Sequence, residues 1–251
     1  MNAPEWMRAD WPAPPGVIAG TTLRQGGVSG GRYASLNLAA HVGDDPGAVE
    51  VNRERLRNAC GLPAEPRWLT QVHGAAVVPA KSAAGLPEAD AIVATQPEAV
   101  CAILTADCLP VVFATSDGEQ IAAAHAGWRG ICAGVLEATL AAIGAAPSAV
   151  LVWLGPAISQ EAFEVGKDVR EAFLARDEDA APLFERNPGG RWQADLAGLA
   201  RLRLRKAGVS QIYGGGRCTF REAGSFFSYR RDGQCGRMAT FIFRRGSRSG
   251  A

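Results

Sequence analysis

The sequence predicts an α+β fold, a single domain of layered, mixed β-sheets flanked by helices. Short apolar segments rich in β-branched residues, at 89–95, 100–106 and 110–115, indicate buried strands with no helix between them. Amphipathic stretches at 168–176 and 194–208 indicate helices in the second half of the chain. Because strands and helices do not alternate strictly, an α+β fold is favoured over a doubly wound α/β fold.

The boundaries of the other elements can be read from their ends. Asp45 suits an N-cap, Pro46 the first helical position and Gly61 a helix stop, so we expect a helix between them. The apolar spacing over 127–144 predicts one helix of about five turns. Further strands are expected at 16–25, 67–74, 75–80, 120–127, 149–159, 225–230 and 237–243.

The chain has 251 residues, of which 47% are hydrophobic and 20% charged, an ordinary globular composition. No repeat, linker or shift in composition divides it. We therefore expect one catalytic domain over residues 1–251, with about 1–12 and 245–251 frayed.

The net charge of +1 gives no electrostatic reason to expect a nucleic-acid or membrane partner. The N-terminal stretch has no apolar signal region, and no segment approaches the ~20 apolar residues of a membrane helix. We expect a soluble, cytoplasmic protein. Its six cysteines form no C-x-x-C pair, so they are expected to be mostly free, buried thiols.

Several catalytic motifs are missing. The glycine-rich GGVSGGRY at 26–33 lacks the Lys-Ser/Thr end of a phosphate-binding P-loop. The letters GVSGG at 27–31 match G-x-S-x-G, but no long helix follows them at once, as the strand–turn–helix elbow of serine hydrolases requires. The H-x-E…P-C-x-x-C signature of zinc deaminases is absent. With only three histidines, the chain also lacks the many imidazoles that multi-copper chemistry needs.

Three residues that can bind a metal stand at predicted strand ends. His73 ends TQVHG, Cys108 follows TAD, and His125 lies in AAAHAG. Two imidazoles and a thiolate, with a fourth position left for water, are typical of a catalytic zinc site. Cys108 paired with His125 or His73 would also suit a nucleophile activated by a base. The residue types alone leave both readings open, together with purely structural roles.

The blocks TTLRQGGVS, TQVHG, ADAIVAT, TADCLPVVF, AAAHAGWRG and SYRRDG resemble the signature blocks of the bacterial laccase-domain, or polyphenol-oxidase-like, family. They follow in order from about residue 20 to 243, so the resemblance covers nearly the whole chain. It implies that His73, Cys108 and His125 bind a catalytic zinc ion, with copper as the alternative metal. One departure is Cys235, where the resemblance leads us to expect a small hydroxyl residue.

Members of this family are described as purine nucleoside phosphorylases, and one branch as a peptidoglycan editing factor. The resemblance thus implies phosphorolysis of adenosine, inosine and methylthioadenosine to free base and ribose 1-phosphate, with deamination of adenosine as a second activity. The partners would be a small nucleoside and phosphate. The editing-factor branch implies an alternative, an amidase or hydrolase that acts on a peptidoglycan precursor through Cys108 or the zinc site. The oligomeric state stays open.

Further residues are candidates for binding the substrates. Arg24 and Arg230 are candidates for the phosphate contact, because a guanidinium is a planar fork of donors, with a structural or surface salt bridge as the alternative for each. Ser35 and Asn37 are expected to line the nucleoside pocket, or else to hold their own loop through backbone hydrogen bonds.

Two more polar residues have alternative roles. Asp107 is expected to act in catalysis, by orienting a water at the metal or a ligand histidine. Otherwise it anchors Arg129 or another arginine. His41 is a candidate proton carrier near the base, with a capping role in its loop as the alternative.

Overall fold

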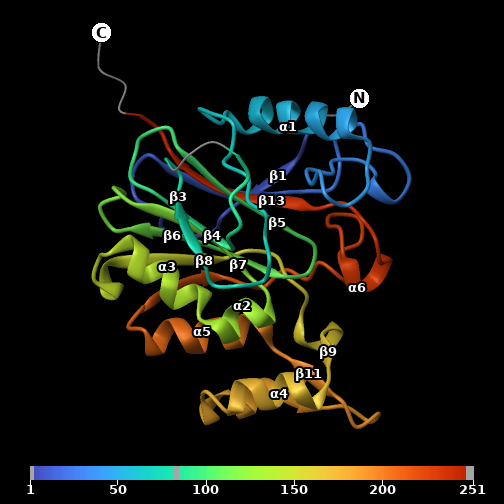
Figure 1. Ribbon diagram of the computed structural model, residues 1–251, viewed down its shortest axis with the longest axis vertical. Helices are drawn as coiled ribbons and strands as arrows, with labels where there is room; N and C mark the ends of the chain where they lie inside the picture. Colours follow the sequence, from blue (N-terminus) through green and yellow to red (C-terminus); the bar gives the residue numbers. More distant parts are fainter. Residues whose placement is uncertain (1–2, 82–84, 247–251) are drawn as a thin grey trace.

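Two stacked sheets form the centre of the computed structural model, which describes residues 3–81 and 85–246 (Figure 1). The first sheet is antiparallel throughout, in the order β1 (Trp6–Arg8), β2 (Val17–Thr22), β13 (Met238–Arg244), β5 (Val100–Thr105). The second has the order β12 (Gln211–Gly214), β8 (Val150–Leu154), β6 (Leu109–Thr115), β7 (Ile121–Ala126), β4 (Ala91–Ala94), β3 (Val77–Pro79). It is mixed, because its edge strands β12 and β3 run parallel to β8 and β4.

Helices cover the outer face of each sheet and give four layers. α1 (Pro46–Cys60) lies over the four-stranded sheet. The six-stranded sheet is covered by α2 (Trp128–Ala133), α3 (Val135–Ile143) and α5 (Leu196–Lys206) (Figure 1).

The alternation of side chains along β6 shows why its segment reads as continuously apolar. Val111 and Phe113 pack in the core beneath the helices, whereas Val112 and Ala114 pack in the core between the two sheets. Both faces of the strand are thus buried, and each needs apolar side chains.

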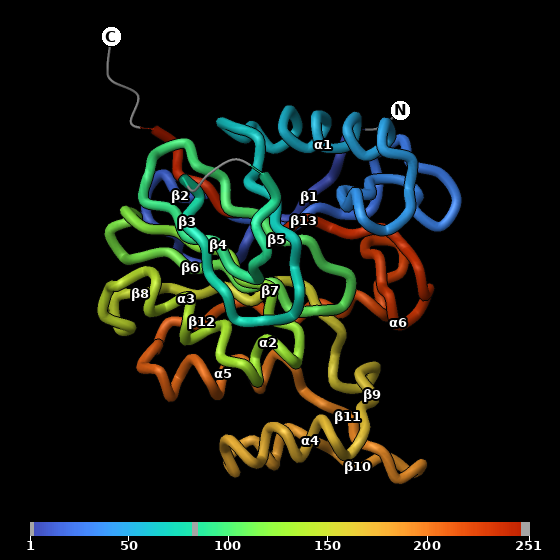
Figure 2. Tube along the Cα trace, viewed as in Figure 1, coloured from blue at the N-terminus to red at the C-terminus, as the bar shows by residue number. Residues whose placement is uncertain are grey.

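A small third sheet projects beyond α5 (Figure 2). Its antiparallel order is β10 (Phe184–Arg186), β11 (Trp192–Ala194), β9 (Glu164–Val165), and α4 (Lys167–Leu174) packs beside it. The remaining short elements are α6 (Tyr229–Asp232) and the 3₁₀ turns Gly31–Tyr33, Pro147–Ala149, Gln160–Ala162 and Glu178–Leu183. No helix in the described part of the chain has the length and apolarity to cross a membrane.

The α+β class and the capping of α1 are confirmed. The Asp45 side chain accepts a hydrogen bond from the Ala48 N–H at 2.7 Å, Pro46 starts the helix, and Gly61 ends it with φ 60°.

Some predicted elements are wrong. The single helix over 127–144 is two helices, because Gly134 turns the chain with φ 96° between α2 and α3. Residues 67–74 make only isolated bridges, at Arg67 and Thr70, because they run into the loop that carries His73. Residues 225–230 form no strand, because Ser228 caps α6.

The chain ends also differ from the expectation of frayed termini. Residues 6–8, expected to be frayed, form β1 and pair with β2. The Trp6 ring packs against the Phe241 ring, with their centroids 5.4 Å apart. Residues 245 and 246 are described, whereas 247–251 lie outside the described residues. The short strands β9 to β12 were not predicted, because β9, β10 and β11 have three residues or fewer and β12 has only four.

Candidate metal centre

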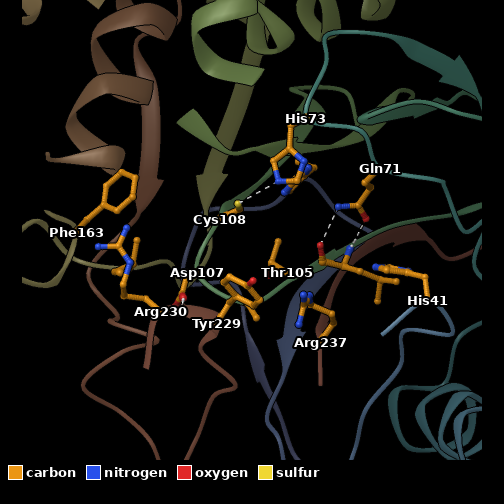
Figure 3. A pocket seen from close by; sticks show the side chains of 14 residues that line it. His41, Gln71, His73, Thr105, Asp107, Cys108, Phe163, Tyr229, Arg230 and Arg237 are labelled. Atoms are coloured by element: carbon orange, nitrogen blue, oxygen red, sulfur yellow. Dashed lines mark hydrogen bonds between the residues drawn. The ribbon is translucent and has the colours of Figure 1, made fainter. Parts of the chain in front are cut away.

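His73, Cys108 and His125 converge at one edge of the central sheets, as the sequence predicts. Their potential ligand atoms all lie within 4.8 Å of one another. Sγ of Cys108 lies 3.9 Å from Nε2 of His73, and the two histidine rings meet edge to face with centroids 4.7 Å apart (Figure 3). His125 is buried, Cys108 is partly buried and His73 is exposed.

Strand register explains how distant residues meet. β6 and β7 are antiparallel, with Leu109 opposite Ala126, so Cys108 lies beside the end of β7 that carries His125. Gly127 makes the close approach feasible, because a Cβ there would lie 3.0 Å from Sγ of Cys108 and 3.2 Å from the His73 ring.

A buried carboxylate that sequence reasoning missed stands behind the ligands. Oδ1 of Asp90 lies 2.8 Å from Nδ1 of His125, and its two oxygens accept hydrogen bonds from the N–H groups of residues 72–74 at 2.7–3.2 Å. Asp90 is fully buried. Its only signal in the sequence was an acidic residue at the start of the apolar segment ADAIVAT, where a charge needs partners.

The charges in this group support one another. Burial alone would raise the pKa of Cys108, but the charge of His125 and hydrogen bonds from both histidines lower it to about 6. Burial alone would lower the pKa of His125, but Cys108 and Asp90 raise it to about 9. Burial alone would raise the pKa of Asp90, but hydrogen bonds from His125 and Gly74 lower it, and the pKa ends below its usual value. The sulfur is therefore held as a thiolate, the form that binds metals.

The donor set fits a zinc ion. Tetrahedral bonds of the usual lengths to sulfur and nitrogen would place the two donors about 3.6 Å apart, close to the 3.9 Å between Cys108 and His73. Because Asp90 takes Nδ1 of His125, the Nε2 of that ring is left for a metal. Among the described residues this is the one group of three or more such side chains with metal-binding spacing.

A cavity of about 500 Å³ opens onto the group (Figure 3). Besides the three ligands, its wall includes His41, Gln71, Leu104, Thr105, Ala106, Asp107, Ile158, Phe163, Tyr229, Arg230 and Arg237. Of these, sequence analysis singled out His41, Asp107 and Arg230. Gln71 fixes the wall by hydrogen bonds at 2.8 Å to both the N–H and the C=O of Leu104.

Asp107 holds the opposite wall in place. Its oxygens accept hydrogen bonds from the Thr219 hydroxyl and the Arg230 N–H, each at 2.6 Å. The carboxylate that contacts a histidine of the cluster is Asp90, not Asp107. Arg129, the suggested partner of Asp107, stacks instead on Trp128. Asp107 thus holds the backbone of Arg230, which the sequence predicts at the substrate.

Three predicted residues are not brought to the cavity wall. The Arg24 guanidinium donates hydrogen bonds to the carbonyls of Ala34 and Ala223 and stacks on the Phe227 ring. The Ser35 hydroxyl accepts a hydrogen bond from the Gly27 N–H.

Asn37, the third of these, is fully buried and bonds to its own loop and to the N–H of Arg237. For Ser35 and Asn37, the geometry matches the loop-holding alternative.

Residues 18–245 match the family described as multi-copper polyphenol oxidoreductase laccase. The chain belongs to this family. The family description names several coppers, but this laccase-family chain has three histidines in all, and two of them lie in one cluster with Cys108.

Relatives and solved structures resemble the laccase-family chain over nearly its full length. It is 53% identical to purine nucleoside phosphorylase YfiH of Escherichia coli K12 over 237 residues, 93% of this chain and 96% of that one. It is 51% identical to purine nucleoside phosphorylase PA4543 of Pseudomonas aeruginosa over 97% of this chain and 99% of the relative. The crystal structure of Neisseria meningitidis protein NMB0706 is 50% identical, with a TM-score of 0.93 and coverage of 96% and 99%. YlmD from Geobacillus stearothermophilus is 33% identical, with a TM-score of 0.88 and coverage of 98% for both chains.

Proposed function

We propose that this protein is a zinc-dependent purine nucleoside phosphorylase that splits adenosine, inosine and methylthioadenosine with phosphate. The observation that carries the proposal is the group His73, Cys108 and His125 at the wall of a cavity of about 500 Å³. A cavity of this size suits a small molecule. The names of the relatives in Escherichia coli and Pseudomonas aeruginosa point to the same reaction class.

In the proposed reaction a phosphate oxygen bonds to C1′ of the ribose while the bond from C1′ to the purine nitrogen breaks. The base leaves with the electron pair and gains a proton. A bound zinc ion would supply Lewis acidity at the cavity wall, which also suits attack of water on C6 of adenosine with loss of ammonia, the proposed deaminase activity. Copper is the alternative metal, because imidazole and thiolate bind both.

The chain's own groups orient the substrates. Tyr229 and Phe163 offer aromatic faces for a purine, and the Arg230 guanidinium lies over the Phe163 ring (Figure 3). Burial and the charges of Arg237 and Arg53 lower the pKa of His41, so its ring is neutral at pH 7 and can both donate and accept a hydrogen bond. The six cysteines are all free thiols, in keeping with a cytoplasmic location.

The second candidate is an amidase or hydrolase that acts on a peptidoglycan precursor, with Cys108 as nucleophile. The observation that favours it is the series Asp90, His125, Cys108, which has the order of a carboxylate–imidazole–thiol triad. Zinc-free protein that still hydrolyses a peptidoglycan precursor, and that loses this activity when its thiol is alkylated, would establish this candidate and exclude the metal enzyme.

The test is turnover of adenosine by the purified metal-bound protein, with and without inorganic phosphate. The proposal expects adenine and ribose 1-phosphate only when phosphate is present, and inosine in either case. Adenosine loss without any ribose 1-phosphate would exclude phosphorolysis and leave deamination.

A further inference from the structure

Arg237 is a cation of the cavity wall that lacks an acidic partner within the described parts of the chain. One terminal nitrogen donates hydrogen bonds to the carbonyls of Cys235 and Gly236 at 2.8 and 3.1 Å. Its backbone N–H is held by the buried side chain of Asn37 at 3.0 Å. The described residues offer no hydrogen-bond partner to its Nε or its second terminal nitrogen. The side chain is thus fixed at one end of the guanidinium and has donors left over.

No carboxylate of the cavity wall neutralises this charge. Asp107 is the one acidic residue among the lining side chains, and its two oxygens already accept hydrogen bonds from Thr219 and the Arg230 N–H. A half-buried cation that is not paired favours an anionic ligand, because leaving it unpaired costs desolvation energy.

The other two candidate arginines are less suited to an anion. All three guanidinium nitrogens of Arg24 already donate hydrogen bonds to the carbonyls of Ala34 and Ala223. Arg230 and Arg237 each lie over an aromatic ring, Phe163 and Tyr229 respectively, but Arg230 is exposed and donates to the Glu164 carbonyl at 2.9 Å (Figure 3). A water-exposed guanidinium gains less from an anion than a half-buried one, because water screens the charge.

Figure 3 places Arg237 between Tyr229 and His41, with its guanidinium on the cavity side. We propose that Arg237, with the His41 ring beside it, binds the phosphate that attacks the nucleoside. This inference rests on the proposed phosphorolysis and names Arg237 as the phosphate ligand in place of Arg24 and Arg230. A guanidinium with two free N–H groups can bind two phosphate oxygens at once.

The first test compares Arg237→Gln with Arg230→Gln in the metal-bound protein. Arg237→Gln is expected to raise the Kd for inorganic phosphate, measured by calorimetry, and the KM for phosphate by about tenfold or more, because a charged hydrogen bond is lost. The KM for adenosine should change by less than about twofold. The KM for phosphate of Arg237→Lys should fall between that of the unaltered protein and that of Arg237→Gln. An unchanged phosphate constant in Arg237→Gln, or a larger effect in Arg230→Gln, overturns the proposal.

The second test uses the unaltered protein, so it does not depend on the folding of a variant. Phenylglyoxal modifies accessible arginines, and peptide mapping by mass spectrometry locates them. Inorganic phosphate is expected to slow modification of Arg237 and to leave the exposed Arg8 of β1 unaffected. No protection of Arg237, or no measurable binding of phosphate, contradicts the proposal.

The two tests also separate this inference from the proposed function. Phosphate that binds and protects Arg237 without splitting adenosine would support the anion site and exclude phosphorolysis. Phosphorolysis that survives Arg237→Gln with an unchanged KM for phosphate would support the function and exclude Arg237 as the ligand.

Discussion

Oδ1 of Asp90 lies 2.8 Å from Nδ1 of His125, and the same buried carboxylate accepts the backbone N–H of His73 at 2.9 Å. Asp90 therefore holds two of the three proposed metal ligands, His125 through its ring and His73 through its backbone. Such partners behind a ligand fix the ring orientation and raise its basicity.

Replacing Asp90 by Asn is expected to weaken zinc affinity about 10- to 100-fold, because the amide cannot hold His125 with a charge. Competition with a chelator measures this affinity. The matched control is Asp117→Asn, which changes an acidic residue that also accepts side-chain and backbone hydrogen bonds, but in the turn after β6. Equal zinc affinity in Asp90→Asn and the unaltered protein would contradict the role given to Asp90.

Alkylation of the zinc-stripped protein tests the charge state of Cys108. Because its pKa is about 6, its reaction with iodoacetamide should rise with pH up to about 7 and then level off, since the thiolate is the reactive form. Burial raises the pKa of Cys60 to about 12, so this thiol should stay unreactive and serves as the internal control. Peptide mapping gives both rates. A Cys108 rate that is half-maximal near pH 8.5, the value of an ordinary thiol, would show that the histidines do not stabilise the thiolate.

Asp107→Asn separates a positioning role from a catalytic one. Loss of one acceptor for Thr219 or the Arg230 N–H should loosen α6, so the KM for adenosine is expected to rise a few-fold while kcat stays within about tenfold. Thr219→Val, which removes the hydroxyl partner alone, should change KM in the same direction. A general base would behave differently, because its loss typically costs about 10²–10⁴ in kcat. A kcat loss of that size would restore Asp107 to the chemistry.

Gly134→Ala tests the break between α2 and α3. Gly134 has φ 96°, a conformation that costs an L-residue about 1–2 kcal/mol, so the free energy of unfolding should fall by roughly that amount. Gly30→Ala is the control, because Gly30 has φ −105° and no atom lies within 4 Å of an added Cβ. Denaturant unfolding measures both, and the kinetic constants should not change. Equal stability of Gly134→Ala and the unaltered protein would show that the chain relaxes at this turn.

The sequence predicts correctly those elements whose stability depends on residues close together in the chain. The cap, proline and glycine of α1 lie within one segment, and the apolar strands β5 and β6 are buried on both faces. The same signals failed where long-range packing decides. Phe226 and Phe227 resemble strand residues but lie in a loop, where both are fully buried against Met238 and Cys235.

The candidate site shows the same limit. The three proposed metal ligands follow from the family blocks, and the structure brings them together. Asp90 and Arg237 could not be found this way, because their roles depend on partners far along the chain. Arg237 is held by Asn37, 200 residues away, and Asp90 meets His125 across 35 residues. Asn37 was predicted at the substrate, yet its side chain holds the backbone N–H of Arg237, the proposed phosphate ligand.

We propose that His73, Cys108 and His125 together hold one metal ion on which phosphorolysis depends. The most direct measurement is metal content by mass spectrometry, alongside phosphate-dependent adenosine turnover, for the unaltered protein and Cys108→Ser. We expect about one zinc per chain in the unaltered protein, and joint loss of zinc and of ribose 1-phosphate formation in the variant. Full phosphorolysis by zinc-free protein, or by Cys108→Ser without metal, would contradict it.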